Sequence, residues 1–256
     1  MIDVHCHLEQ KDYDKDRESL IKEWKKQLKA IITSSAHYKD FELTMKIANK
    51  HQNFVFSSLG LHPEFIKELQ ESKKQDYIKK IIESKNKIVA IGEIGLDYNW
   101  VKEQAWQEKQ KLMFIEFIKL AKQLDLPIIV HSRDAMQDTI KILEQENMKG
   151  KKVLFHIFNT KEFLPRILEN NWSISIGPLL LKSKEIKKIV RDCPLEKIML
   201  ETDSPWFGFG ARGTPLNVIK VAEKIAEIKR LSLNEIEAQT DKNAIGFFQL
   251  KLESIS

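Results

Sequence analysis

The sequence contains a set of histidines and acids whose types and spacing could bind metal ions. His5 and His7 are two residues apart in MIDVHCHL, so on an extended strand both side chains point to one side. Other histidines occur in GLHP, IIVHSR and LFHIFN, and acids occur in AIGEIGLDY and MLETDSP. Imidazole and carboxylate groups together suit zinc, manganese or a similar divalent ion. The candidate residues are His5, His7, His62, Glu93, His131, His156 and Asp203.

The size of this set indicates two metal ions. Without His62 it contains four histidines and two acids, too many for one catalytic ion that must keep an open position. Two ions that share a carboxylate would use the whole set, and such pairs clamp both oxygens of an in-line displacement. A single histidine or acid at a strand end is more often a core or capping residue. The prediction therefore depends on all six residues occurring together. Cys6 should point away from the set and be buried.

The apolar pattern indicates the elements that would position these residues. Eight short β-rich runs alternate with longer amphipathic stretches of helical periodicity. Such alternation predicts a parallel sheet, and eight units in 256 residues fit an α/β fold, a (β/α)8 TIM barrel with extra C-terminal helices. The predicted strands cover residues 1–7, 29–37, 53–62, 88–97, 127–133, 153–159, 172–177 and 198–205. The clearest helical stretches are 18–28, 40–50, 108–124, 134–146 and a closing segment at 232–248.

The barrel is preferred over an open doubly wound sheet. An open sheet would normally have a glycine-rich phosphate loop after its first strand, whereas the first strand here ends in HCHL. In a barrel, the carboxyl ends of all strands open onto one face, where active sites lie. Candidate residues spread over about 200 positions would then meet at one mouth. We expect a single domain over residues 1–256.

Composition limits the class of protein. Hydrophobic residues make up 42% of the chain and charged residues 31%, as in globular proteins. Neither a membrane span nor a signal peptide is predicted, because no long apolar run is present. Two cysteines, Cys6 and Cys193, form no disulfide framework, so we expect a reducing compartment and a cytoplasmic location. The net charge of +5 is compatible with a polyanionic partner. We expect neither a membrane partner nor an obligatory protein partner.

Taken together, these segments resemble the TatD-type metal-dependent deoxyribonucleases, a branch of the amidohydrolase-like barrel hydrolases. HxH alone is shared with many hydrolases, but its combination with the other segments, in the family's order and spacing, is specific. The matching segments are DVHCHL at 3–8, GLHP at 60–63, GEIGLDY at 92–98, HSRDA at 131–135, FHIF at 155–158, ETDSP at 201–205 and KNAIGFF at 242–248. One departure follows ETDSP: Gly213 and Thr214 stand where the family has an asparagine and an acid, which leaves substrate preference open.

The resemblance implies a role for each candidate residue and two divalent ions, zinc, magnesium or manganese, as cofactors. One ion would be held by His5, His7 and Asp203, the other by His131 and His156, and Glu93 would bridge them. His62 and Arg133 would contact the substrate phosphate. Two alternatives stay open here: His62 could stabilise the turn before Pro63, and Arg133 could pair with Asp134.

The implied activity is hydrolysis of phosphodiester bonds in DNA, by exonuclease or endonuclease action on single-stranded or damaged strands. Asp203 would orient the attacking water and accept its proton, and Arg133 would bind phosphate through two hydrogen bonds. Two other functions remain open: a barrel hydrolase acting on an amide, lactone or aminoacyl ester, and a non-catalytic metal or nucleic-acid binding module. For Trp206 and Phe207, a core or lid role is preferred over stacking on a base.

Overall fold

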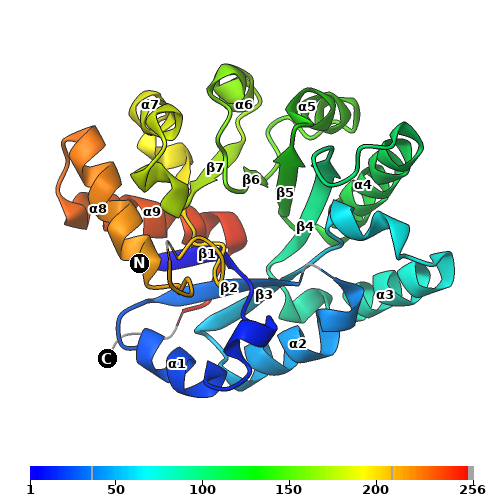
Figure 1. Ribbon diagram of the computed structural model, residues 1–256, viewed down its shortest axis with the longest axis horizontal. Coiled ribbons are helices and arrows are strands. Elements are labelled where there is room, and N and C mark those ends of the chain that lie inside the picture. The colour runs from blue at the N-terminus through cyan, green and yellow to red at the C-terminus, as the bar shows by residue number, and fades with distance from the viewer. Residues whose placement is uncertain (36, 209, 253–256) are drawn as a thin grey trace.

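Eight parallel strands form one sheet in chain order in the computed structural model, and helices surround them (Figure 1). The structure describes residues 1–35, 37–208 and 210–252. Ala36 of the predicted second strand, Phe209 of the loop after Asp203 and residues 253–256 of the predicted domain lie outside the described residues. The strands are β1 (Ile2–Cys6), β2 (Ala30–Ser35), β3 (Val55–Leu59), β4 (Ala90–Asp97), β5 (Ile128–Arg133), β6 (Val153–Phe155), β7 (Ser173–Ile176) and β8 (Ile198–Leu200).

Helices follow the strands as the sequence predicts, so the (β/α)8 barrel is confirmed. The predicted closing segment is a single helix, α9, which begins with a capping box between Ser232 and Glu235. The helices are α1 (Arg17–Trp24), α2 (Phe41–Lys50), α3 (Glu71–Glu83), α4 (Gln104–Leu124), α5 (Met136–Gln145), α6 (Leu164–Glu169), α7 (Lys184–Asp192), α8 (Asn217–Lys229) and α9 (Leu233–Phe248).

The barrel closes where β8 meets β1. The N–H of Asp203 donates to the carbonyl of His5 at 2.9 Å. Just inside this junction, the buried carboxylate of Asp3 accepts hydrogen bonds from the N–H groups of His5 (3.2 Å) and Thr202 (3.1 Å). The register of β1 against β2 shifts between Asp3 and Cys6, so strict alternation does not continue along this strand. Asp3 therefore fixes the backbone of two strands and does not contact a candidate imidazole ring.

An apolar plug fills the amino-terminal end of the barrel. Inward-facing residues of six strands, among them Ile2, Ile129 and Met199, form a buried cluster with Phe247 and Phe248 of α9. The extra helix thus seals the end of the barrel that lies opposite the carboxyl ends of the strands. The plug leaves the carboxyl-terminal part of the barrel interior for polar side chains.

Two composition-based expectations can be compared with the structure. Cys6 and Cys193 are both buried with free thiols, and Cys6 packs in the apolar core as expected. Within the described ranges, no helix is both long and apolar enough to pass through a membrane.

Candidate metal centre

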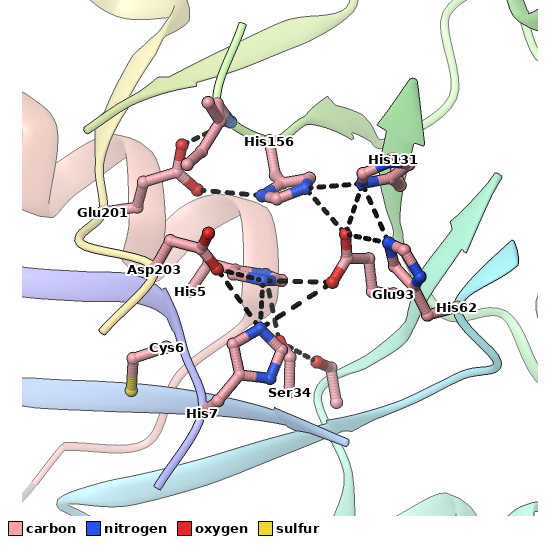
Figure 2. Close-up of polar contacts among 12 residues, drawn as sticks. His5, Cys6, His7, Ser34, His62, Glu93, His131, His156, Glu201 and Asp203 are labelled. Carbon is pink, nitrogen blue, oxygen red and sulfur yellow. Dashed lines mark hydrogen bonds and ion pairs between the residues drawn. The ribbon is translucent and has the colours of Figure 1, made fainter. Parts of the chain in front are cut away.

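The structure brings the six predicted ligands together at the carboxyl ends of five strands (Figure 2). All of them except His5 line a cavity of about 760 Å³. His5, the innermost, is fully buried, and Glu93 is 3% exposed between the two groups of histidines. The residues that converge are His5, His7, Glu93, His131, His156 and Asp203.

One half of the centre is formed by β1 and the segment that follows β8. The Nε2 atoms of His5 and His7 are 3.1 Å apart. Oδ1 of Asp203 lies 3.2 Å from Nε2 of His7 and 3.6 Å from Nε2 of His5. Oε2 of Glu93 lies 3.4 Å from the same nitrogen of His5. Two imidazole nitrogens and two carboxylate oxygens therefore surround one point.

The other half is formed by β5 and the end of β6. Oε1 of Glu93 lies 2.8 Å from Nδ1 of His131 and 2.7 Å from Nε2 of His156. The two ring nitrogens are 3.2 Å apart. Glu93 thus directs one carboxylate oxygen to each half, as a bridging carboxylate must.

The donor set fits divalent ions. Ring nitrogens that ligate a metal carry lone pairs, and here such nitrogens face one another at 3.1–3.2 Å across each half. Acceptor atoms gathered in this way need a cation or protons between them. Among the described residues there are three groups whose ligand atoms all lie within 4.8 Å of one another, and the first two share His5: His5, His7 and Asp203; His5, Glu93 and His156; and His62, Asp97 and His131.

The two β1 histidines are oriented by groups behind them. Oγ of Ser34 lies 3.1 Å from Nδ1 of His5, and Oε1 of Glu9 lies 3.2 Å from Nδ1 of His7. A partner on Nδ1 leaves Nε2 to face the centre and fixes the ring orientation. Glu9 is itself buried and accepts a hydrogen bond from Thr33.

His131 and His156 have carboxylates behind them too. Oδ2 of Asp97 lies 2.8 Å from Nε2 of His131, which leaves Nδ1 to face Glu93. We therefore assign Asp97 to orienting His131, although its distances would also permit ligation. Oε2 of Glu201 lies 3.7 Å from Nδ1 of His156.

The backbone beside His156 is strained. Ile157 has a φ of 44°, a left-handed conformation that is costly for a β-branched residue. The N–H of Ile157 donates to the carboxylate of Glu201, the same group that faces the ring of His156. Glu201 therefore holds the chain segment that presents His156, and its second oxygen faces the ring at 3.7 Å.

Charge interactions and hydrogen bonds keep the carboxylate of Glu93 ionised. Burial raises the pKa of Glu93, but the charge of nearby imidazoles, His156 first, and hydrogen bonds donated by His131 and His156 outweigh burial and hold this pKa well below its usual value. Burial lowers the pKa of His7, but the hydrogen bonds that its ring donates to Asp203 and Glu9 raise this pKa well above its usual value. In the ion-free protein, protons on the imidazoles thus balance the carboxylates, and bound cations would replace those protons.

His62 lies at the edge of the second half and also shapes a turn. It caps the 3₁₀ turn Pro63–Lys67, with Nδ1 accepting the N–H of Glu64 at 3.2 Å. The Glu64 carboxylate also lies 3.3 Å from Nδ1, but the N–H contact has hydrogen-bond geometry, so we assign the ring proton to Nε2. Nε2 lies 3.6 Å from Oε1 of Glu93. Because burial and the neighbouring His131 lower the pKa of His62 to about 3, the ring is a neutral donor facing the cavity.

Arg133 lies at the cavity without a carboxylate partner. Within the described residues it makes no ion pair, and Asp134 accepts a hydrogen bond from Asn99. The proposed ion pair with Asp134 is therefore wrong. The guanidinium instead lies 5.5 Å from the ring centroid of Trp100.

The loop after Asp203 turns its arginine away from the cavity. Arg212 makes an ion pair with Asp16 at 2.6 Å and lies over the ring of Tyr13. The loop is therefore tied to the segment after β1. Trp206 lines the cavity and is 46% exposed, so a core role for this side chain is wrong.

Sequence reasoning missed the groups that orient the histidines. Asp97 and Glu201 stand inside the matched segments GEIGLDY and ETDSP, and Glu9 continues the two-residue spacing of His5 and His7. These positions could have identified the three acids as candidate partners of the histidines. Nothing in the sequence singles out Ser34 from its neighbouring serine, because only the fold decides which hydroxyl faces a ring.

A larger cavity, of about 910 Å³, lies at the other end of the barrel. Its lining includes Val55, Val89 and Pro127, which precede or begin strands, and Phe248 of α9. Among the described residues, its only acid is Asp125 and it has no histidine. We therefore place the chemistry in the smaller cavity, where the ligand atoms converge.

Comparison with known proteins agrees with this geometry. The family model described as "TatD related DNase" matches residues 2–249. The chain belongs to this family. Deoxyribonuclease TATDN3 of Homo sapiens is 35% identical over 260 residues, which cover 97% of this chain and 94% of the human protein. An uncharacterized metal-dependent hydrolase of Bacillus subtilis, YabD, is 32% identical over 258 residues, 98% of this chain and 99% of that protein.

Solved structures of TatD proteins share the fold. A hydrolase of the TatD family from Entamoeba histolytica superimposes with a TM-score of 0.89 at 25% identity, covering 98% of each chain. The resemblance seen in the sequence, and the hydrolase class that it implied, are confirmed by membership of the TatD related DNase family. The metal-dependent relatives and the ligand groups together support the use of a divalent metal.

Proposed function

We propose that the protein is a deoxyribonuclease that hydrolyses phosphodiester bonds with two divalent ions. The observation that carries the proposal is the position of Glu93, whose two oxygens face separate histidine pairs. The naming of the human relative as a deoxyribonuclease supports DNA as the substrate. In this proposal His5, His7 and Asp203 hold one ion, and His131 and His156 hold the other.

Bound ions of this kind polarise the phosphodiester and make water a stronger nucleophile at neutral pH. Glu93, 3% exposed and ionised, holds the two halves at a fixed separation. Asp203 lines the cavity beside His7 and accepts the proton of the attacking water. The carboxylates of Glu9 and Asp97 keep the rings of His7 and His131 in the orientation that ligation requires.

Arg133 and His62 would bind the phosphate. Arg133 is the only lysine or arginine among the described residues that line the cavity, so it supplies the fixed positive charge there. Its guanidinium can donate two parallel hydrogen bonds to one phosphate. The Nε2–H of His62 can donate to a phosphate oxygen while Nδ1 keeps its contact with Glu64.

Incubation with end-labelled single-stranded DNA tests this function. Protein with a full metal complement should shorten the strand, and a chelator should stop the reaction. The Glu93→Gln variant should be inactive, whereas Glu108→Gln, on the exposed face of α4, should match the wild type. If fully loaded protein leaves DNA intact but opens amides, lactones or aminoacyl esters, the site serves another hydrolase reaction. Tight DNA binding without turnover would instead indicate a binding module.

A further inference from the structure

Two exposed tryptophans flank the candidate metal centre. Trp100 follows β4 and is 63% exposed, and Trp206 follows β8 and is 46% exposed. Both line the 760 Å³ cavity. Since β4 and β8 are four strands apart in an eight-stranded barrel, their following segments reach the mouth from opposite sides.

Both tryptophans are held by residues of the site itself. The N–H of Trp100 donates to Oδ1 of Asp97 at 2.7 Å, while Oδ2 of Asp97 contacts His131. The N–H of Trp206 donates to the carbonyl of Asp203 at 3.1 Å. Each tryptophan therefore stands three residues after an acid of the site, Asp97 at the end of β4 or Asp203 in the segment after β8, in a position fixed relative to the candidate metal ligands.

The surroundings of the two indoles suit a nucleotide strand. The rings of Trp206 and His7 are in an edge-type contact, with centroids 4.7 Å apart and an interplanar angle of 61°. The guanidinium of Arg133 lies over the Trp100 ring, 5.5 Å from its centroid, so the group proposed to bind phosphate and an aromatic surface lie next to each other. Binding sites for single strands combine these two features, a charge for the backbone and an aromatic surface for a base.

We infer that Trp100 and Trp206 are base-stacking platforms that hold a single strand of DNA across the metal centre, an inference that rests on the proposed nuclease function. One base would stack on each side of the phosphate that is cut. Every base has a π face, so this contact tolerates all sequences. Inside a duplex, neighbouring bases cover those faces, and stacking on protein requires unpairing. The site would therefore select single strands or frayed ends.

Kinetics on strands with and without bases test this inference. Trp100→Ala and Trp206→Ala should each lower kcat/KM on a short single strand by roughly 10- to 100-fold. Neither variant should differ from the wild type on an abasic strand of the same length, because no base is left to stack. Leu112→Ala is the matched control, since Leu112 is 68% exposed on α4 and lies outside the cavity. Metal content and melting temperature should be unchanged in all three variants.

Tryptophan fluorescence gives a second measurement that does not require turnover. Trp24 and Trp172 are buried, so quenching on mixing with oligothymidylate would come from exposed indoles. Quenching should be lost in the Trp100→Ala, Trp206→Ala double variant. It should persist in Trp106→Phe, because Trp106 is half-buried and lies outside the cavity.

The outcomes separate this inference from the proposed function. If the wild type cuts the single strand and the alanine variants cut it equally well, stacking is wrong and the nuclease function stands. Equal losses of kcat/KM on intact and abasic strands would also overturn stacking, because they would indicate damage to the site. If the wild type cuts neither strand, the proposed function fails, and absence of quenching by oligothymidylate would then remove the stacking platforms as well.

Discussion

The substitution Asp97→Asn tests how the centre is oriented. The buried carboxylate of Asp97 accepts three contacts: Oδ1 accepts the N–H groups of Asn99 (2.9 Å) and Trp100 (2.7 Å), and Oδ2 accepts Nε2–H of His131 (2.8 Å). An asparagine would keep its oxygen on the two backbone donors and turn its NH₂ group toward His131. The ring would then have to accept at Nε2 and carry its proton on Nδ1, the atom that faces Glu93.

The free-energy cost of Asp97→Asn for metal binding can be estimated in two ways. Loss of a hydrogen bond to a charged acceptor costs about 1.5–3 kcal/mol. Loss of a group that orients a metal ligand lowers metal affinity by roughly 10- to 100-fold, which is about 1.4–2.7 kcal/mol. The two estimates agree, so we expect a loss in that range. The loss of metal affinity should be confined to the half that contains His131 and His156, because Asp97 does not contact the β1 histidines.

Calorimetric titration with a divalent ion would measure the loss. The Asp97→Asn variant should retain one tight site and weaken the other, and Glu9→Gln should weaken the half that contains His7. Asp138→Asn is the control, because Asp138 accepts from Tyr98 and pairs with Lys111 without contacting an imidazole. If Asp97→Asn binds both ions like the wild type, or weakens both sites equally, the assigned orientation of His131 is refuted.

Three further results are expected. Gly95→Ala should abolish metal binding or folding, because Gly95 has a φ of +149° and an added Cβ would lie 1.9 Å from the carbonyl oxygen of His131. Gly246→Ala should fold normally, as measured by circular dichroism, because an added Cβ there would meet no atom within 4 Å. Metal affinity should rise with pH, since ligation displaces protons from histidines whose pKa values the carboxylates raise against the effect of burial; calorimetry in two buffers would detect the released protons. Burial and, to a smaller extent, the neighbouring carboxylate of Glu9 raise the pKa of Asp40 to about 6, so ionisation of Asp40 destabilises the ion-free fold. Asp40→Asn should therefore raise the melting temperature most above pH 6, and this gain should shrink towards about pH 4.

The convergence of the six candidate ligands was predictable because it follows from the topology of the barrel. His131 ends an apolar run and Glu93 lies within another, and in a barrel all such ends meet at one face. The sequence needed only to indicate eight strand–helix units for distant residues to converge. The two-residue spacing of His5 and His7 then indicated a shared direction, which the structure shows for their rings.

Other features depended on side-chain direction and long-range contacts, which periodicity does not contain. Glu201 and Asp203 belong to one short segment, but one faces the back of His156 and the other faces the cavity. Arg212 lies in the loop beside the mouth, yet its partner is Asp16, almost 200 residues earlier. The exposure of Trp206 likewise depends on how that loop folds.

The rate of DNA hydrolysis as a function of the number of ions bound per chain tests the central claim most directly. Two ions joined by Glu93 predict that a single strand is cut only as the second ion binds, and that Glu93→Gln neither binds two ions tightly nor cuts. Full activity with one ion per chain would contradict the two-ion centre. An intact strand at two ions per chain would contradict the nuclease function.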